Sequence, residues 1–148
     1  MSSSLSHSQA DVVRWLLIAQ SIGTDPSLSA AWPIYVSNEP DTPDNLITIY
    51  DTAGIFDGRI QRSGEKVEYR GIMIQVRGTS HPVTWAKIDA LRLVLDETVN
   101  KTIVDVSTNQ YIVYSISRQS GPIALGKEPE TSRFLFSINC VVTLRQLS

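Results

Sequence analysis

The segment from residue 134 to residue 145 contains the most regular pattern in the chain. Apolar side chains occupy every second position and polar ones occupy most positions between; the two sets are Phe134, Phe136, Ile138, Cys140, Val142, Leu144 and Ser137, Asn139, Thr143, Arg145. Successive side chains of a β-strand point to opposite faces, so this period of two predicts a long strand with one buried face. The fold must therefore include a sheet of which one face is covered.

Five shorter segments also have the pattern of strands. They are residues 32–36, 46–50, 67–77, 102–106 and 110–118. Pro33 cannot donate to a central ladder, which predicts that the first segment lies at an edge or that proline stands at its start. Turn signals at Gly58 and Gly64 predict a long hairpin arm at about residues 53–66. Residues 119–132 are expected to form a loop.

Two segments have helical spacing. Ser8, with an acid three residues later at Asp11, is typical of a helix start, and this helix is expected at about residues 8–21. Gly23 is expected to supply its left-handed C-terminal cap. The second helix is expected at about residues 82–99, since proline suits a first turn. Its apolar stripe consists of Trp85, Ile88, Leu91, Leu95 and Val99.

These elements predict one α+β domain over residues 1–148. Its mostly antiparallel (mixed) sheet has about five to six strands, with two packed helices and the long hairpin arm. The 148 residues are 42% hydrophobic and 19% charged, which fits a folded globule. The apolar run near the N-terminus contains Arg14 and is too short to span a bilayer. We therefore expect no membrane association and synthesis in a reducing cytoplasm.

A net charge of −2 argues against a bulk positive field for nucleic acid. One cysteine and two histidines exclude an intramolecular disulfide and make a self-contained metal centre improbable. Cys140 lies on the apolar face of the last strand and is interpreted as a core residue. His7 and His81 are interpreted as surface or capping residues. We expect no catalytic, cofactor-binding or metal-binding residues, and no cofactor.

Gly121, Gly126 and Lys127 imitate the spacing of a phosphate-binding loop. The next residue of that motif is Ser or Thr, which holds magnesium, but here it is Glu128, which would repel phosphate. The residues after this loop have the pattern of a strand, so the loop lacks the following helix whose N-terminus would face the phosphate. A plain loop between strands is the favoured interpretation.

Asp51, Thr52, Ala53 and Gly54 follow a strand and resemble the signature of retroviral-type aspartic proteases, which pair one carboxylate from each of two chains. Ala53 replaces the glycine that lets the catalytic turn close. The two helices also have no place in so compact a β fold. We keep a protease that uses Asp51 as a remote alternative, and favour the interpretation that Asp51 ends a strand and caps a turn.

Charge is distributed unevenly along the chain. Residues 1–58 carry seven acidic residues and one basic residue, whereas residues 59–148 carry eight and twelve. The basic residues on or beside the expected arm are Arg59, Arg62, Lys66 and Arg70. Two solvated patches would explain this pattern. Alternatively, an acidic patch of one subunit that includes Asp51 and Asp57 meets the basic arm of the next, a heterologous contact of the kind that closes rings.

Several runs of residues between Trp32 and Leu95 resemble the tail terminator, or minor capsid (tail completion), proteins of long-tailed bacteriophages. These runs are Trp-Pro-Ile-Tyr-Val at 32–36, Glu-Pro-Asp-Thr-Pro-Asp-Asn at 39–45, Ile-Thr-Ile-Tyr-Asp-Thr at 47–52 with Gly54, Arg-Gly-Ile-Met-Ile-Gln-Val-Arg-Gly at 70–78, and Trp-Ala-Lys at 85–87 with Leu91 and Leu95. In that family the strand that ends in Ile-Tyr-Asp-Thr leads into a loop of variable length. Ala53 departs from the family pattern, in which a second glycine is common.

The resemblance implies a structural virion protein at the head–tail junction that is not an enzyme. Such proteins form a ring, usually a hexamer, that caps the tail tube, ends its polymerisation and offers a joining surface to the head. The implied partners are other copies of the chain, the tail tube protein and a head-completion or connector protein. DNA would pass through the lumen without sequence-specific binding, and Asp41 and Asp44 are candidates to line it because they repel phosphate. Another head–tail connector or a tail-tube component is the alternative.

Overall fold

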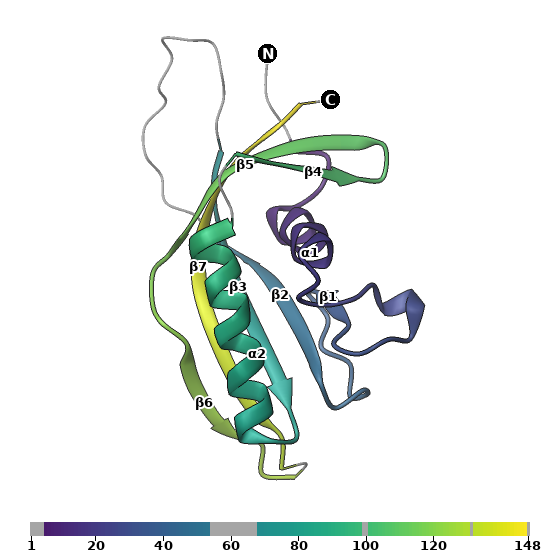
Figure 1. The fold of residues 1–148 in the computed structure, drawn as a ribbon, viewed down its shortest axis with the longest axis vertical. Helices are drawn as coiled ribbons and strands as arrows, with labels where there is room; N and C mark the ends of the chain where they lie inside the picture. Colours follow the sequence, from purple (N-terminus) through teal and green to yellow (C-terminus); the bar gives the residue numbers. More distant parts are fainter. Residues whose placement is uncertain (1–4, 54–67, 99–100, 131, 148) are drawn as a thin grey trace.

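The computed structural model describes residues 5–53, 68–98, 101–130 and 132–147. Within these residues, seven strands form one curled sheet that carries two helices (Figure 1). The elements are α1 (Gln9–Ala19), η1 (Pro26–Leu28), β1 (Ile34–Val36), β2 (Leu46–Thr52), β3 (Glu68–Gly78), α2 (His81–Leu93), η2 (Val94–Thr98), β4 (Thr102–Val106), β5 (Asn109–Arg118), β6 (Ile123–Lys127) and β7 (Phe134–Gln146). The predicted α+β class is confirmed.

The long C-terminal strand β7 organises the sheet. It pairs antiparallel with β3 along nearly its whole length, from Gly78 opposite Phe134 to Glu68 opposite Leu144. Its other side pairs first with β6 and then with β5, so the strand order is β1-β2-β3-β7-β5-β4, with β6 beside β7. The strand β1 is parallel to β2, which makes the sheet mixed. The strictest sequence pattern therefore corresponds to the strand with the most neighbours.

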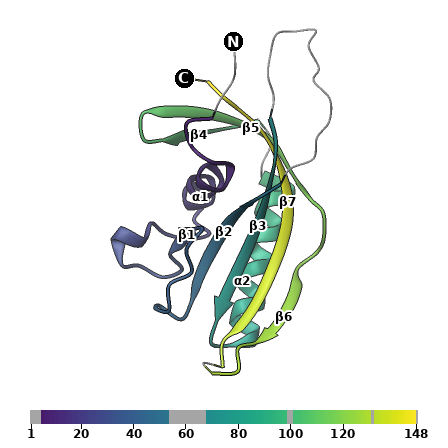
Figure 2. The same ribbon diagram turned by 180° about the vertical axis from the view of Figure 1, so that it is seen from behind.

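Both helices lie on the same face of the sheet, and in the described part of the chain the opposite face carries no helix (Figures 1 and 2). α1 packs toward β1, β2 and β4, whereas α2 packs on β3 and β7. The core between helices and sheet is apolar and closed to solvent: Ile72 and Ile74 of β3, Ile138 of β7 and Leu17 of α1 are each 0% exposed. Burial of this face accounts for the alternation in the strands.

The start of α1 is as predicted, and its end is not. The Ser8 side chain accepts a hydrogen bond from the Asp11 amide, and the helix ends at Ala19. Ser21, not Gly23, adopts the left-handed conformation, with φ of 61°. Gly23 is needed for space, because a Cβ atom there would lie 2.5 Å from Ile34 Cγ1 and 2.7 Å from the Trp32 carbonyl oxygen.

The interpretation of residues 119–132 as a loop is wrong, because they contain β6. Every residue of this strand is exposed, and a bulge between Ala124 and Gly126 shifts its register on β7. Exposure on both faces and the bulge remove the alternation that reveals a strand. The second helix ends at Leu93 and continues as the π turn η2, close to the expected range. The expected arm at 53–66 lies outside the described residues apart from Ala53.

Candidate subunit-contact surface

Residues 37–45 connect β1 to β2 and contain Glu39, Asp41 and Asp44; we call them the acidic loop. Arg77, near the end of β3, is 3% exposed beneath this loop. Its guanidinium donates hydrogen bonds to the carbonyl oxygens of Pro40 and Pro43, both at 2.7 Å. It also lies 3.3 Å from the Glu39 carboxylate. A buried charge is stable only when it is paired and hydrogen-bonded, and the loop supplies these partners.

A second buried arginine joins the acidic loop to the turn between β6 and β7. The Arg133 side chain is 5% exposed and donates to the Asp41 carbonyl oxygen at 2.6 Å. Its other nitrogens lie 3.2 Å from the Asp41 carboxylate and 2.8 Å from that of Glu128. The two arginines therefore fix a loop that has no regular secondary structure of its own.

The acidic loop presents its carboxylates to solvent although its backbone is fixed. The side chain of Asp41 is 88% exposed and that of Asp44 is 60% exposed. Both lie within 3.5 Å of Arg133, so the structure brings the two predicted lumen residues together around one cation. The result is a rigid acidic surface whose charge is partly compensated.

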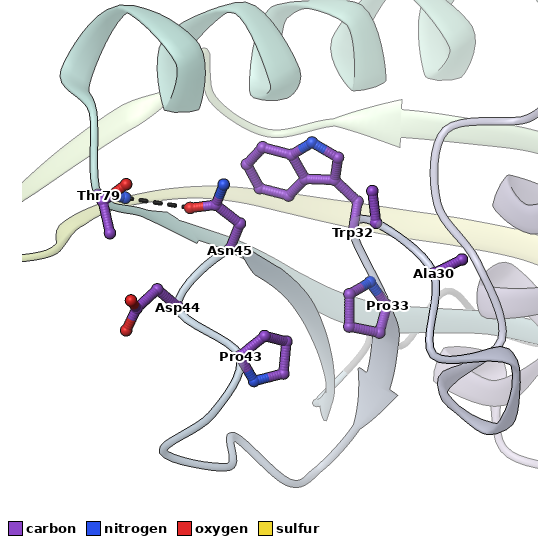
Figure 3. A pocket seen from close by; sticks show the side chains of 8 residues that line it. Ala30, Trp32, Pro33, Pro43, Asp44, Asn45 and Thr79 are labelled. Atoms are coloured by element: carbon purple, nitrogen blue, oxygen red, sulfur yellow. Dashed lines mark hydrogen bonds between the residues drawn. The ribbon is translucent and has the colours of Figure 1, made fainter.

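A hollow of about 320 Å³ lies beside the acidic loop (Figure 3). Its lining consists of Ala30, Ala31, Trp32, Pro33, Pro43, Asp44, Asn45 and Thr79. Trp32 has φ of 55°, which a bulky side chain rarely adopts, and Lys87 Nζ lies 5.2 Å from its ring centroid. The Asn45 side chain accepts a hydrogen bond from the Thr79 amide and holds the two strand ends together. An aromatic and proline surface with a carboxylate at its rim suits contact with protein.

Asp51 lies at the opposite end of β2 from the acidic loop. Its Oδ1 accepts a hydrogen bond of 2.9 Å from the Ala10 amide, in the first turn of α1. A carboxylate there satisfies a free helix donor and interacts favourably with the helix dipole. Asp51 therefore caps the N-terminus of α1, and its position is explained without catalysis.

The predicted basic surface is described only in part. Arg70 lies in β3 opposite Val142, at the same end of the sheet as Asp51. Asp57, Arg59, Arg62 and Lys66 lie outside the described residues. The predicted acidic residues thus divide between the two ends of β2, with Asp41 and Asp44 at one end and Asp51 at the other.

Sequence reasoning missed both buried arginines. The sequence analysis gave Arg77 and Arg133 no role of their own. The sequence holds no signal for them, since the pairing of Arg77 with Leu46, a residue only 1% exposed, is known only from the structure. Because Arg77 stands opposite a buried residue, its guanidinium is buried too and needs hydrogen-bond partners, which the acidic loop supplies.

Cys140, Asp96 and His7 are titratable residues whose contacts are explained by the structure of the chain. Burial raises the pKa of the Cys140 thiol to about 12, so this cysteine is an unreactive core residue, as predicted. Hydrogen bonds from Arg118 lower the pKa of Asp96, and their shortest distance is 2.7 Å. His7 contacts the Tyr111 hydroxyl at 2.6 Å. The described part of the chain contains no group of three His, Cys, Asp or Glu residues placed to hold a metal ion.

The structure is an α+β sheet with both helices on one face and an acidic loop held by two buried arginines. The family model described as bacteriophage tail terminator protein matches residues 16–146. The chain belongs to this family and is a bacteriophage tail protein. A comparison with curated proteins found no match. None of the described helices has both the length and the apolar character needed to cross a membrane.

Proposed function

We propose that this chain is a structural virion protein that forms a ring of six copies on the end of the tail tube. The ring ends tube polymerisation and provides the surface that joins the tail to the head. The observation that carries this proposal is the family match over residues 16–146. The partners are other copies of the chain, the tube protein and a head-completion or connector protein, and no side chain performs catalysis.

The edges of the sheet support assembly through backbone contacts. β1 and β4 stand at the two ends of the strand order, and β6 pairs only with β7 among the described strands. An edge strand offers a row of N–H and C=O groups to another chain. All five residues of β6 are exposed, including Ile123 and Leu125. These features suit a chain whose edge strands pair with strands of neighbouring copies.

The charge distribution supports a heterologous contact within the ring. We assign the basic residues Arg59, Arg62, Lys66 and Arg70 of one copy to an acidic surface of the next that includes Asp51 and Asp57. Opposite charges on two surfaces of one chain set the register of a head-to-tail contact. Reversing Arg59 and Arg62 to Glu should weaken ring formation, and the loss should be smaller at high salt, where the wild-type attraction is itself screened.

We assign Asp41 and Asp44 to the lumen of the ring. Their exposed carboxylates occupy fixed positions and would repel the phosphates of passing DNA. In assembled rings, Asp41→Asn with Asp44→Asn should increase DNA retention, and Glu97→Gln, at an exposed position in η2 at the far end of α2, is the control for loss of an acid elsewhere. Unchanged retention would remove these residues from the lumen.

Negative-stain imaging of the purified protein, with and without tube protein, tests the function. A ring at one end of each tube, together with tubes that stop growing, is the expected result. Incorporation of the chain along the tube would instead make it a tube component. A chain that never associates with tubes would contradict the proposal.

A further inference from the structure

The helix α2 turns an apolar face to solvent. Val83 is 50% exposed and Leu93 is 39% exposed. Ala86 is exposed and Ala90 half-buried between them, and the four residues follow a spacing of three, four and three. This spacing places them on one line along the helix, the arrangement of a helix seam that packs against a partner. We call Val83, Ala86, Ala90 and Leu93 the α2 ridge.

Most of the α2 ridge is not needed to attach the helix to its own sheet; of its four residues, Ala90 also packs against the core. Ile88 and Leu91, on the opposite face, are 0% exposed and supply the packing on β3 and β7. Trp85, on the flank of the helix toward β7, is 43% exposed, with its ring 5.8 Å from that of Phe136. A contiguous exposed apolar surface, unlike scattered single residues, indicates a contact site.

A complementary surface lies between α1 and β4 of the same chain. A hollow of about 250 Å³ is lined by Trp15, Leu16, Ile18, Ala19, Thr102, Ile103, Val104 and Asp105; we call it the α1–β4 hollow. Ile103 at its edge is 47% exposed. A cavity of about 150 Å³ admits a benzene-sized group, so this hollow has room for aliphatic side chains. Asp105 is the only ionisable group in its lining.

We propose that the α2 ridge of one copy packs into the α1–β4 hollow of the next copy. This inference rests on the proposed ring. A cyclic assembly needs two different surfaces on each chain that fit one another, and here one is a convex apolar helix face and the other an apolar hollow. The small side chains of Ala86 and Ala90 let the neighbour approach the helix closely. α2 has 13 residues, about 20 Å, which is long enough for a contact of standard size.

The two surfaces lie over different parts of the sheet, as a head-to-tail contact requires. α2 covers β3 and β7, while α1 packs toward β1 and β2 and has β4 alongside it (Figure 1). A contact of one α2 ridge with another would instead be two-fold and would produce closed pairs. In such a pair, both chains would use the same ridge residues.

Two substitutions test this contact. Ala86→Arg places a charge on the ridge, and Ile103→Arg places one at the hollow. Both positions are exposed, so each variant should keep the wild-type unfolding transition in urea. Each alone should abolish ring formation in the presence of tube protein, as measured by native mass spectrometry. Thr108→Arg, at an exposed position in the turn between β4 and β5, is the control and should leave the ring intact.

Mixing the two variants is the decisive step. The Ala86→Arg chain keeps its hollow and the Ile103→Arg chain keeps its ridge, so one productive contact remains. The mixture should yield a complex of one copy of each, at twice 16.4 kDa, that cannot extend. Failure of the mixture to pair would overturn the proposal. If Ala86→Arg abolished assembly while Ile103→Arg left the ring intact, the proposal would also be overturned, and ridge-to-ridge pairing would be indicated instead.

The outcomes separate this inference from the proposed function. A wild-type ring that survives both substitutions overturns the ridge contact and leaves the ring in place. A wild-type chain that remains monomeric with tube protein overturns the ring, and the ridge contact with it.

Discussion

The two helices lie on the same face of one sheet but differ in how they are covered. α1 is enclosed by the sheet and by β4, and its residues Val12, Val13 and Leu17 are 0% exposed. Among the described residues α2 is covered on one side only, and its outer line includes Val83 and Leu93, at 50% and 39% exposure. The buried apolar residues of α1 therefore serve the chain's own core, although Trp15 and Ile18 line the α1–β4 hollow, whereas the outer apolar residues of α2 exceed what the core requires. Folding and assembly should accordingly be separable by substitution.

The largest effect is expected in the enclosed helix. Leu16 is 1% exposed, and Leu16→Ala removes buried methyl groups and leaves a cavity beneath α1. The free energy of unfolding should fall by about 3 kcal/mol, measured by urea denaturation. A loss below about 1 kcal/mol would show that α1 is less tightly packed than the structure indicates.

A somewhat smaller effect is expected where a buried charge fixes the acidic loop. Arg133→Met keeps the side-chain stem but removes the cation that binds Asp41 and Glu128. Stability should decrease by about 2 kcal/mol, less than for a fully buried pair because the Asp41 carboxylate is exposed. Arg92→Met, a surface control, should cost under about 1 kcal/mol. Equal losses for the two variants would contradict a structural role for Arg133.

The ion pair that fixes the end of α2 should have a measurable pH dependence. The pKa of Asp96 lies below its ordinary value of 3.8 because Arg118 donates to its carboxylate. The stabilisation is present above that ordinary value and is lost as pH falls through the lower folded-state pKa. Asp96→Asn should cost about 1 kcal/mol at pH 7 and progressively less in acid. A cost that does not change with pH would exclude this ionic origin.

The smallest effect on stability is expected on the α2 ridge. Leu93→Ser exchanges a half-exposed apolar side chain for a polar one and should change the unfolding free energy by no more than about 0.5 kcal/mol. Thermal unfolding of the monomer would measure this change. A loss as large as that of Leu16→Ala would mean that both helices serve the core equally.

The parts of the fold that follow from local chemistry could be predicted from the sequence. Ser8 could be identified as an N-cap, and the alternation from Phe134 to Leu144 defined β7, because both depend on neighbouring residues. β6 could not be predicted, since an exposed edge strand with a bulge at Gly126 has no alternation. The roles of Arg77 and Arg133 depend on contacts with a loop 33 to 92 residues away along the chain, which spacing cannot reveal. For the same reason Asp51 was not identified as the cap of α1.

Whether the chain works by forming a ring is tested most directly by the mass of the particle that it forms with tube protein. Native mass spectrometry of the species released from tube ends should give six times 16.4 kDa. A mass of one copy, or a continuous series of masses without a closed species, would contradict assembly into a ring.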